Sequence, residues 1–284
     1  MFPIWVQYKI DGVRSIVREN QCTGRSLKAH KNVALTEYFS RPIFNGFDME
    51  MGATHPNDPH LCRLTTSLSG TIKGPLPKFV IVFDYLDVDV DDLPFELRMR
   101  ALKAYCSVAD FPKDVAVYVS PQYKINSMEE LIKFYEDALA DGYEGLIIRK
   151  PDGKHKNGRC TVTEGNYLRI KPTGDAEGTF LRCEEAMENN NEATVNALGH
   201  TERSSHKDNK KPKGMIGALW IKVITTGQEI KIGPGTLTHE QRKYYFENQD
   251  ELADKIIKYK FLDTGMKDKP RHARFFSFRN KEDL

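Results

Sequence analysis

The sequence predicts an α+β fold in two parts, and three observations predict it. The first part alternates strand-like and helix-like stretches, whereas the second carries short strands around one capped helix, as in a small β-barrel. A segment rich in Pro and Gly, at 171–178, separates the two parts. We therefore expect one domain over 1–173 and a second over 174–284, which suits a chain of 284 residues.

The stretch QYKIDGVRSIV, close to the N-terminus, predicts a β-hairpin. Apolar and polar side chains alternate from Val6 to Ile10, which is the two-residue period of a half-buried strand. The pair Asp11-Gly12 then predicts a hairpin turn, with the following residues as the returning strand. On this pattern alone, Lys9 would be a solvated lysine on the polar face of the hairpin.

The rest of the first part contains a buried strand and a well-marked helix. The run KFVIVFDYL at 78–86 predicts a strand that is buried on both faces. The run at 127–142 predicts a helix, because its apolar residues form one stripe, Ser127 and Glu130 suit a capping box, and Gly142 suits its end. Strand candidates flank this helix on both sides.

The second part combines barrel strands with a long polar insertion. The runs GTFLRCEEAM, GALWIKVI and QEIKIG predict short strands, and two more are expected near the C-terminal end. The insertion at about 189–214 lies between the first two, and loops of this length in a compact domain are usually functional or disordered. Thr238 and Gln241 predict a capping box at the start of a helix.

Composition and charge exclude several classes of protein. With 39% hydrophobic and 29% charged residues the chain is of the globular type, and we expect neither a membrane span nor a secretory signal. The five cysteines include no C-x-x-C pair, which argues against a zinc site and a disulfide framework and fits a reducing compartment, the cytoplasm or nucleus. Two basic clusters, at 199–213 and 255–281, indicate surfaces that bind a polyanion.

Lys9 belongs to an ordered set of short motifs. In chain order these are KIDGVR, TGRSLK, FDMEM, VFDYL, YEGLIIRKP, YLRIKP and KPRHARFFSFRNK. Their content and order resemble those of the covalent nucleotidyltransferases, which comprise ATP-dependent DNA ligases, RNA ligases and mRNA capping enzymes. Taken together, they most closely resemble the minimal virus-encoded ATP-dependent DNA ligases, which have only two domains.

This resemblance implies a fold and an activity. The fold would be an ATP-grasp-like adenylyltransferase domain of antiparallel sheets and helices, followed by an OB-fold β-barrel. The activity would be the sealing of 3′-hydroxyl/5′-phosphate nicks in duplex DNA, with ATP as the nucleotide, a lysyl-AMP adduct, and Mg²⁺ or another divalent cation. The partner would be nicked duplex DNA, which a monomer would encircle by means of a latch-like insertion.

The resemblance also implies roles for individual residues. The catalytic residues would be Lys9, Asp11, Arg169 and Lys171. The nucleotide would contact Arg14, Glu50, Phe83, Glu144, Lys171, Arg271 and Arg279. Glu50 and Glu144 would also hold the metal, since hard cations prefer oxygen ligands. The DNA would contact Arg25 and Lys28 in the first part and, in the insertion, Arg203, His206, Lys207, Lys210, Lys211 and Lys213.

The chemistry explains why such residues occur together. A lysine amine attacks a phosphate only in its neutral form, and positive charge nearby, from Lys171 and a metal ion, favours that form. Phosphoryl transfer also needs positive charge on the non-bridging oxygens while pyrophosphate leaves in line. Two positions depart from the usual motifs, because Met49 stands where Gly is usual and Arg169 stands where Lys is usual.

Several of these residues, and the chain as a whole, also suit alternative roles. Phe83 suits an apolar core, Glu144 suits a turn before a strand, and the cations of TGRSLK suit a solvated loop. Among related activities, an mRNA guanylyltransferase would use GTP, and an RNA ligase would share the lysine chemistry. A non-catalytic nucleic-acid clamp would bind without turnover, although the intact Lys9 and Lys171 argue against it.

Overall fold

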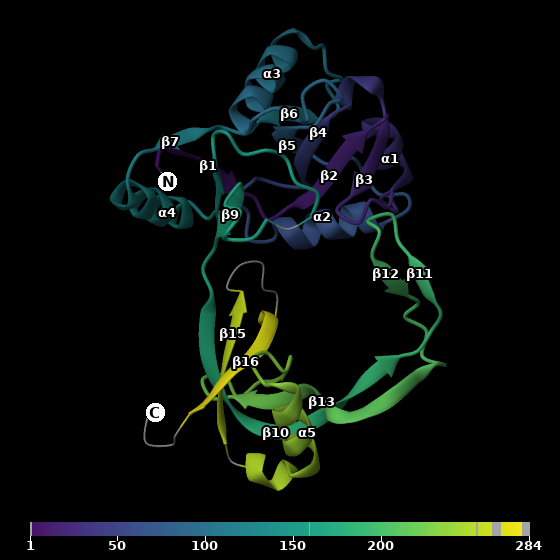
Figure 1. The fold of residues 1–284 in the computed structure, drawn as a ribbon, viewed down its shortest axis with the longest axis vertical. Coiled ribbons are helices and arrows are strands. Elements are labelled where there is room, and N and C mark those ends of the chain that lie inside the picture. The colour runs from purple at the N-terminus through teal and green to yellow at the C-terminus, as the bar shows by residue number, and fades with distance from the viewer. Residues whose placement is uncertain (1, 159, 254, 263–267, 280–284) are drawn as a thin grey trace. The chain divides into compact units, whose positions relative to one another are not determined.

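The computed structural model describes residues 2–158, 160–253, 255–262 and 268–279. The chain divides into two compact units, 1–171 and 172–284 (Figure 1). Each unit has its own hydrophobic core. Within the described residues, no helix combines the length and the apolar character needed to cross a lipid bilayer.

The first unit contains two separate sheets. A four-stranded sheet has the order β7-β1-β8-β9, with the bounds Tyr123–Ile125, Ile4–Lys9, Gly145–Arg149 and Tyr167–Ile170. A five-stranded sheet has the order β3-β2-β4-β5-β6, with the bounds Gln21–Gly24, Val13–Arg18, Phe47–Gly52, Phe79–Tyr85 and Ala116–Val119. β5 and β6 pair in parallel, and the other neighbours are antiparallel.

The predicted N-terminal hairpin is wrong, because the segment at Asp11-Gly12 connects the two sheets. β1 pairs with β7 on one side and β8 on the other, while β2 pairs with β3 and β4. A Cβ atom at Gly12 would lie 2.2 Å from the Met51 carbonyl oxygen and 2.9 Å from Glu50 Cγ. Glycine is therefore needed here because the connection passes close to β4, and not because the chain turns back.

We expect Gly12→Ala to lower the free energy of unfolding by about 1–3 kcal/mol, the usual cost of forcing a methyl group into filled space. Urea unfolding would measure this. Gly70→Ala is the matched control, because a Cβ atom there would meet open space within the described structure. Equal stability of Gly12→Ala and the wild type would contradict the close passage beside β4.

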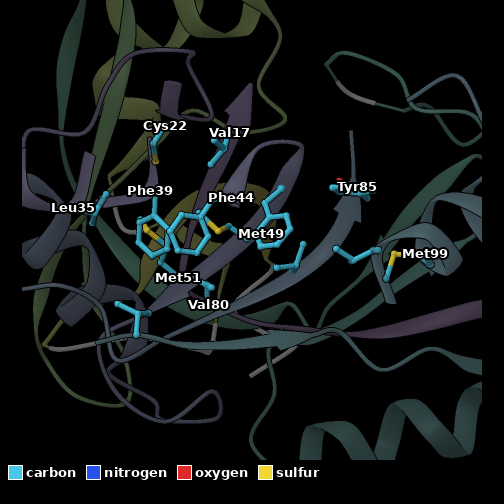
Figure 2. Close-up of a cluster of buried hydrophobic side chains, with 14 of the residues drawn as sticks. Val17, Cys22, Leu35, Phe39, Phe44, Met49, Met51, Val80, Tyr85 and Met99 are labelled. Carbon is cyan, nitrogen blue, oxygen red and sulfur yellow. The ribbon is translucent and has the colours of Figure 1, made fainter. Parts of the chain in front are cut away.

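The five-stranded sheet carries the larger core of the first unit. The sequence predicts that β5 is buried on both faces, but only the face of Val80 and Val82 is fully buried, because Ile81 and Phe83 on the other face are half-buried. Figure 2 shows the aromatic and methionine side chains that pack against it, including Met49 and Met51 of β4. The helices of this part are α1 (Val33–Phe39), α2 (Leu61–Gly70) and α3 (Phe95–Val108), with a 3₁₀ turn at Pro42–Phe44.

The helix predicted at 127–142 forms as α4 (Met128–Ala140) and covers the four-stranded sheet. The Ser127 hydroxyl accepts a hydrogen bond from the Glu130 N–H at 3.2 Å. The Glu130 carboxylate accepts from the Asn126 N–H at 2.8 Å, one residue before the position that a capping box requires. Gly142, with φ of +86°, follows the end of the helix as predicted.

The described part of the second unit contains a five-stranded antiparallel sheet in the order β14-β13-β10-β15-β16. The helix α5 (His239–Glu247) and a 3₁₀ turn at Gln249–Leu252 accompany it. The strand bounds are Glu229–Ile232, Lys210–Val223, Gly174–Asn189, Ile256–Leu262 and Arg271–Arg279. A parallel bridge between Gly233 and Arg274 joins the two ends of the sheet, as in a barrel. The predicted capping box of Thr238 and Gln241 is confirmed.

The expectation of short strands is wrong for β10 and β13, which have 16 and 14 residues. Both continue beyond the barrel, where Asn189 pairs with Lys210. β11 (Ala193–Val195) and β12 (Thr201–Arg203) then pair with each other. They extend the two paired strands away from α5 as one two-stranded ribbon (Figure 1). The polar insertion is therefore an ordered β-ribbon and not an irregular loop.

Candidate active site

The two sheets of the first unit each supply half of a polar site. Strand ends of the four-stranded sheet carry Lys9, Glu144 and Lys171. Strands of the five-stranded sheet carry Arg14, Asp48, Glu50 and Phe83. The charges of Lys9 and Glu144 act on the Glu50 carboxyl, so the two halves meet within this unit.

The Glu144 carboxylate holds the two predicted lysines together. Lys9 Nζ forms an ion pair with Glu144 Oε2, and Lys171 Nζ lies 3.3 Å from Glu144 Oε1. The Glu144 side chain is only 4% exposed, whereas those of Lys9 and Lys171 are 20% and 26% exposed. Both lysine side chains are thus partly exposed at a site whose carboxylate is buried.

Gly145 permits the close approach of the strands that carry these groups. Its φ is +145°, a backbone conformation that residues with a Cβ atom rarely adopt. A Cβ atom there would lie 2.1 Å from the Ile170 carbonyl oxygen and 3.0 Å from Lys171 Cα. A side chain at this position would push β9 away and displace Lys171 from Glu144.

Asp48, a residue for which the motifs implied no role, clamps Arg14. Arg14 Nε donates to Asp48 Oδ1 at 2.7 Å, and Nη2 donates to Oδ2 at 2.6 Å. Asp48 is buried while Arg14 is half-buried, so the guanidinium is held in place by a bidentate pair. The available sequence signal was the spacing of Asp48 and Glu50, because residues two apart on a strand share one face.

Burial and the charged residues around Glu50 shift the pKa of its carboxyl in opposite directions. Burial is the largest influence and raises the pKa of this carboxyl from 4.5 to about 8. Lys9 and Arg14 act in the opposite direction and lower the pKa, whereas Asp48 and Glu144 raise it. The carboxyl is therefore largely protonated at neutral pH, and a cation bound beside it would favour its ionised form.

The carboxylates of Glu50 and Glu144 fit a magnesium ion held largely by phosphate and water. In the part of the chain that the structure describes, no group of three or more His, Cys, Asp or Glu side chains is placed to hold a metal. Mg²⁺ commonly takes one or two carboxylates together with substrate phosphates, and does not require an all-protein cage. The donor set therefore suits a metal that binds together with a nucleotide.

Phe83 is half-buried beside the cations of the site. Its ring centroid lies 5.7 Å from the guanidinium carbon of Arg14 and 5.9 Å from that of Arg149. The pairing of β4 with β5 is irregular at this point, since Asp48 pairs with Asp84 and Met49 with Val82, so Phe83 lies between these two pairs. The contacts with Arg14 and Arg149, and not a regular alternation, place the Phe83 ring beside the polar site.

A buried ionic network behind Phe83 joins the two sheets. Asp84 accepts from Arg98 at 2.7 and 2.9 Å and from Arg149 Nη1 at 3.4 Å. Burial alone would raise the pKa of Asp84, but Arg149 and Arg98 lower it. Arg149 Nε donates to Gln7 Oε1 at 3.2 Å, and Gln7 Nε2 donates to the Phe83 carbonyl at 3.0 Å. The motif resemblance assigned no role to this network.

The other predicted residues of the first unit lie around this site. Asp11 is half-buried in the connection between the sheets, and Arg169 is exposed on β9 opposite Ile147. Arg25 and Lys28 are exposed in the loop that follows β3. Met49, which replaces the usual Gly, is fully buried in the core, and the pairing of β4 with β5 is irregular between Asp48 and Met49.

The predicted residues of the second unit lie on β16 and on the ribbon. Arg271 and Arg279 are half-buried on β16, and Arg279 Nε donates to Glu177 Oε1 at 2.9 Å. The last two residues of the motif KPRHARFFSFRNK lie outside the described residues. The ribbon presents Lys210 as half-buried, and the exposed residues are Arg203, His206, Lys207, Lys211 and Lys213.

The ribbon has its own internal supports. The Asn191 side chain is buried and donates to the carbonyls of Ser204 and His206 at 2.9 and 2.8 Å. Arg203 Nη1 donates to the Asn191 carbonyl, and Lys213 Nζ lies 3.9 Å from Glu188. Arg203 thus stabilises the ribbon itself, while its neighbours present positive charge to solvent.

Two family models match this chain. Residues 53–171 match the ATP dependent DNA ligase domain, and residues 209–279 match the DNA ligase OB-like domain. The chain belongs to the ATP-dependent DNA ligase family. Glu144 and Lys171 fall within the first match, and Arg271 and Arg279 fall within the second. The predicted α+β fold with a C-terminal OB domain is confirmed.

Similar proteins support this membership. The DNA ligase of Enterobacteria phage T3 is 29% identical over 92 residues, which is 32% of this chain and a quarter (25%) of the phage protein. A crystal structure of Chlorella virus DNA ligase-adenylate is 27% identical, with a TM-score of 0.51, and the match covers 100% of this chain and 94% of that chain. A structure of a Lig E DNA ligase has a TM-score of 0.69 at 20% identity and covers 97% and 92% of the two chains.

Proposed function

We propose that this chain seals 3′-hydroxyl/5′-phosphate nicks in duplex DNA with ATP, through an adenylate on Lys9 and then on the DNA. The observation that carries the proposal is the shared carboxylate of Glu144, which holds the amines of Lys9 and Lys171 together. From the other sheet, Arg14 adds positive charge of the kind that a triphosphate needs, and Glu50 adds a carboxyl that could hold a divalent ion.

In the first step the Lys9 amine attacks the α-phosphorus of ATP. A phosphorus–nitrogen bond forms, the bond to the β-phosphate oxygen breaks, and pyrophosphate leaves. The exposed face of the lysine pair is where the α-phosphate would lie, with Lys171 on a non-bridging oxygen. The α-phosphate would replace Glu144 as the partner of Lys171. The Glu144 carboxylate would still contact Lys9, and it could accept the proton that Lys9 must lose before it attacks.

In the later steps the adenylate moves to DNA and is then released. The 5′-phosphate at the nick attacks the adenylate, so the phosphorus–nitrogen bond breaks and a 5′-5′ pyrophosphate linkage forms. The 3′-hydroxyl oxygen then attacks the activated 5′-phosphate, loses its proton and expels AMP. Arg14, which Asp48 holds in a bidentate pair, is suited to fix a phosphate or ribose group in these steps.

A divalent ion would supply positive charge at the reacting phosphate, and Glu50 and Glu144 would hold it. Phe83 would stack on the nucleotide base from its half-buried position. Arg271 and Arg279 would orient the leaving pyrophosphate, which requires Arg279 to exchange Glu177 for phosphate. We further propose that the chain acts as a monomer, with the ribbon of the second unit contacting the far side of the duplex.

The test is covalent labelling with ATP or GTP that carries its label on the α-phosphate, with and without Mg²⁺, followed by the sealing of nicked DNA. We expect an acid-labile AMP adduct that requires Mg²⁺ and disappears when nicked DNA is sealed. A GMP adduct would instead indicate a guanylyltransferase. Absence of any adduct, in protein free of pre-bound AMP, would overturn the proposal in favour of a binding protein.

Neutralising the ribbon cations should weaken DNA binding without affecting adduct formation. We expect the quadruple Ala variant of Lys207, Lys210, Lys211 and Lys213 to bind nicked DNA more weakly. The slope of log Kd against log salt should fall by up to about 0.9 for each lost phosphate contact.

The matched control for the ribbon variant removes four exposed lysines elsewhere. These are Lys103, Lys113, Lys124 and Lys133. Their removal changes the net charge of the chain by the same amount. An identical salt series for the two quadruple variants would contradict a DNA-binding role for the ribbon.

A further inference from the structure

A hydrogen bond of His30 holds the loop between β3 and α1 against the sheet that carries Arg14. His30 Nε2 lies 2.6 Å from the hydroxyl of Ser15, a fully buried residue next to Arg14 on β2. The Ser15 hydroxyl also contacts Met51 Sδ at 3.4 Å. The backbone of His30 is held as well, because its carbonyl accepts from Thr36 Oγ1 at 3.2 Å.

The loop between β3 and α1 contains a tight turn with a strained backbone conformation at Leu27. The Gly24 N–H donates to the Lys28 carbonyl, and the Leu27 N–H donates to the Gly24 carbonyl, both at 2.9 Å. Leu27 has φ of +56°, and a branched residue in this left-handed region costs about 1 kcal/mol or more. A Cβ atom at Gly24 would lie 3.3 Å from His30 Cε1, so the imidazole packs directly against this turn.

The same loop carries positive charge into solvent. The segment GRSLKAHK contains Arg25, Lys28 and Lys31 with no acidic residue, and all three side chains are exposed. Burial lowers the pKa of His30, so its imidazole is neutral and contributes a hydrogen bond and not a charge. A rigid loop of this kind suits a phosphodiester backbone, since phosphate contacts fix the register of a nucleic acid on a protein.

We propose that His30 is a positioning residue for the DNA steps of ligation. Through its hydrogen bond to Ser15 on β2, the strand that also carries Arg14, His30 fixes the position of the loop. Arg25 on this loop then contacts a DNA phosphate at a fixed position relative to Arg14. Self-adenylylation does not involve this loop and so does not depend on His30. This inference rests on the proposed DNA ligase function.

The test separates the first step from the DNA steps in His30→Phe and His30→Gln, with His55→Phe as control because His55 is exposed outside the site. We expect adduct formation from labelled ATP to stay within about twofold of the wild type in all three. For His30→Phe, the KM for nicked DNA should rise about tenfold or more, with kcat changed less than threefold. His30→Gln retains a hydrogen-bonding group and should restore most of the loss.

The double variant Arg25→Ala/His30→Phe decides whether His30 acts through Arg25. If it does, the double variant should be little worse than Arg25→Ala alone, because the loop then has no phosphate contact left to position. Fully additive losses, or an equal fall in adduct formation and sealing, would overturn the inference. If wild-type protein forms an adduct but none of the variants changes KM for DNA, His30 has no such role. If wild-type protein forms no adduct, it is the proposed function that fails.

Discussion

Lys9→Arg should abolish covalent nucleotide capture while leaving the fold intact. Arginine keeps a positive charge beside Glu144, so the buried carboxylate retains a partner and the thermal midpoint should stay close to that of the wild type. A guanidinium does not lose its proton near neutral pH and cannot act as the nucleophile. Adduct formation should therefore fall on the order of 10⁴-fold or more.

The measurement compares Lys9→Arg with Lys171→Arg, which alters the other lysine on the same carboxylate. Lys171→Arg keeps a cation for the phosphate and keeps the Lys9 nucleophile, so its adduct should form more slowly but still appear. Nicked DNA that carries a chemically installed 5′-adenylate bypasses the first step, and we expect Lys9→Arg to seal this substrate. If the Lys9→Arg variant were labelled to a near wild-type level, another residue would have to accept the nucleotide.

Local patterns predicted elements well, but they did not predict which strands pair. The runs that became β5, α4 and α5 carry their signals within a few residues, as apolar periods and capping residues. The segment Asp11-Gly12 also carries a local signal, for a turn, but Gly12 is there because of its contact with β4. An alternating pattern reports which faces of a strand are buried, and it does not name the partner strand.

In the candidate site, too, the sequence predicted the residues that belong to local motifs but not those that depend on a partner elsewhere in the chain. Motif order was sufficient to select Lys9, Glu144 and Lys171, which the structure brings onto one carboxylate. It did not select Asp48 or Arg149, because the role of each depends on a charged partner on another strand, Arg14 for Asp48 and Asp84 for Arg149. A charged residue inside an apolar strand was the available signal, since such groups are buried only when paired.

The ribbon shows why a polar segment can be misread as a loop. Its strands are solvated on both faces beyond the barrel, so no apolar residue is needed every second position and no two-residue period appears. Main-chain pairing and the buried amide of Asn191 hold it instead. Neither interaction depends on side-chain hydrophobicity, and so composition indicated a loop.

Glu50→Gln should make the protein more stable and nearly inactive. Burial raises the pKa of Glu50 from 4.5 to about 8, so between these pH values the folded protein holds a proton that the unfolded chain has released. Stability from this group is thus fully present below about pH 4.5 and is lost as the pH rises towards 8. Glutamine does not titrate, and at pH 8 the variant should gain up to about 4–5 kcal/mol over the wild type, because a difference of one pKa unit corresponds to about 1.4 kcal/mol.

Urea unfolding at pH 5.5, 7 and 8.5 would measure this gain, with the exposed Glu136→Gln as the matched control. The gap between Glu50→Gln and the wild type should widen with pH, while Glu136→Gln should follow the wild type. Adduct formation with Mg²⁺ should fall in Glu50→Gln alone, because an amide cannot supply the negative charge that a divalent ion requires. A gap that does not change with pH would mean that Glu50 is already ionised without ligand. A widening gap together with lost activity would mean that the fold keeps a destabilising carboxyl because the bound nucleotide and metal need it.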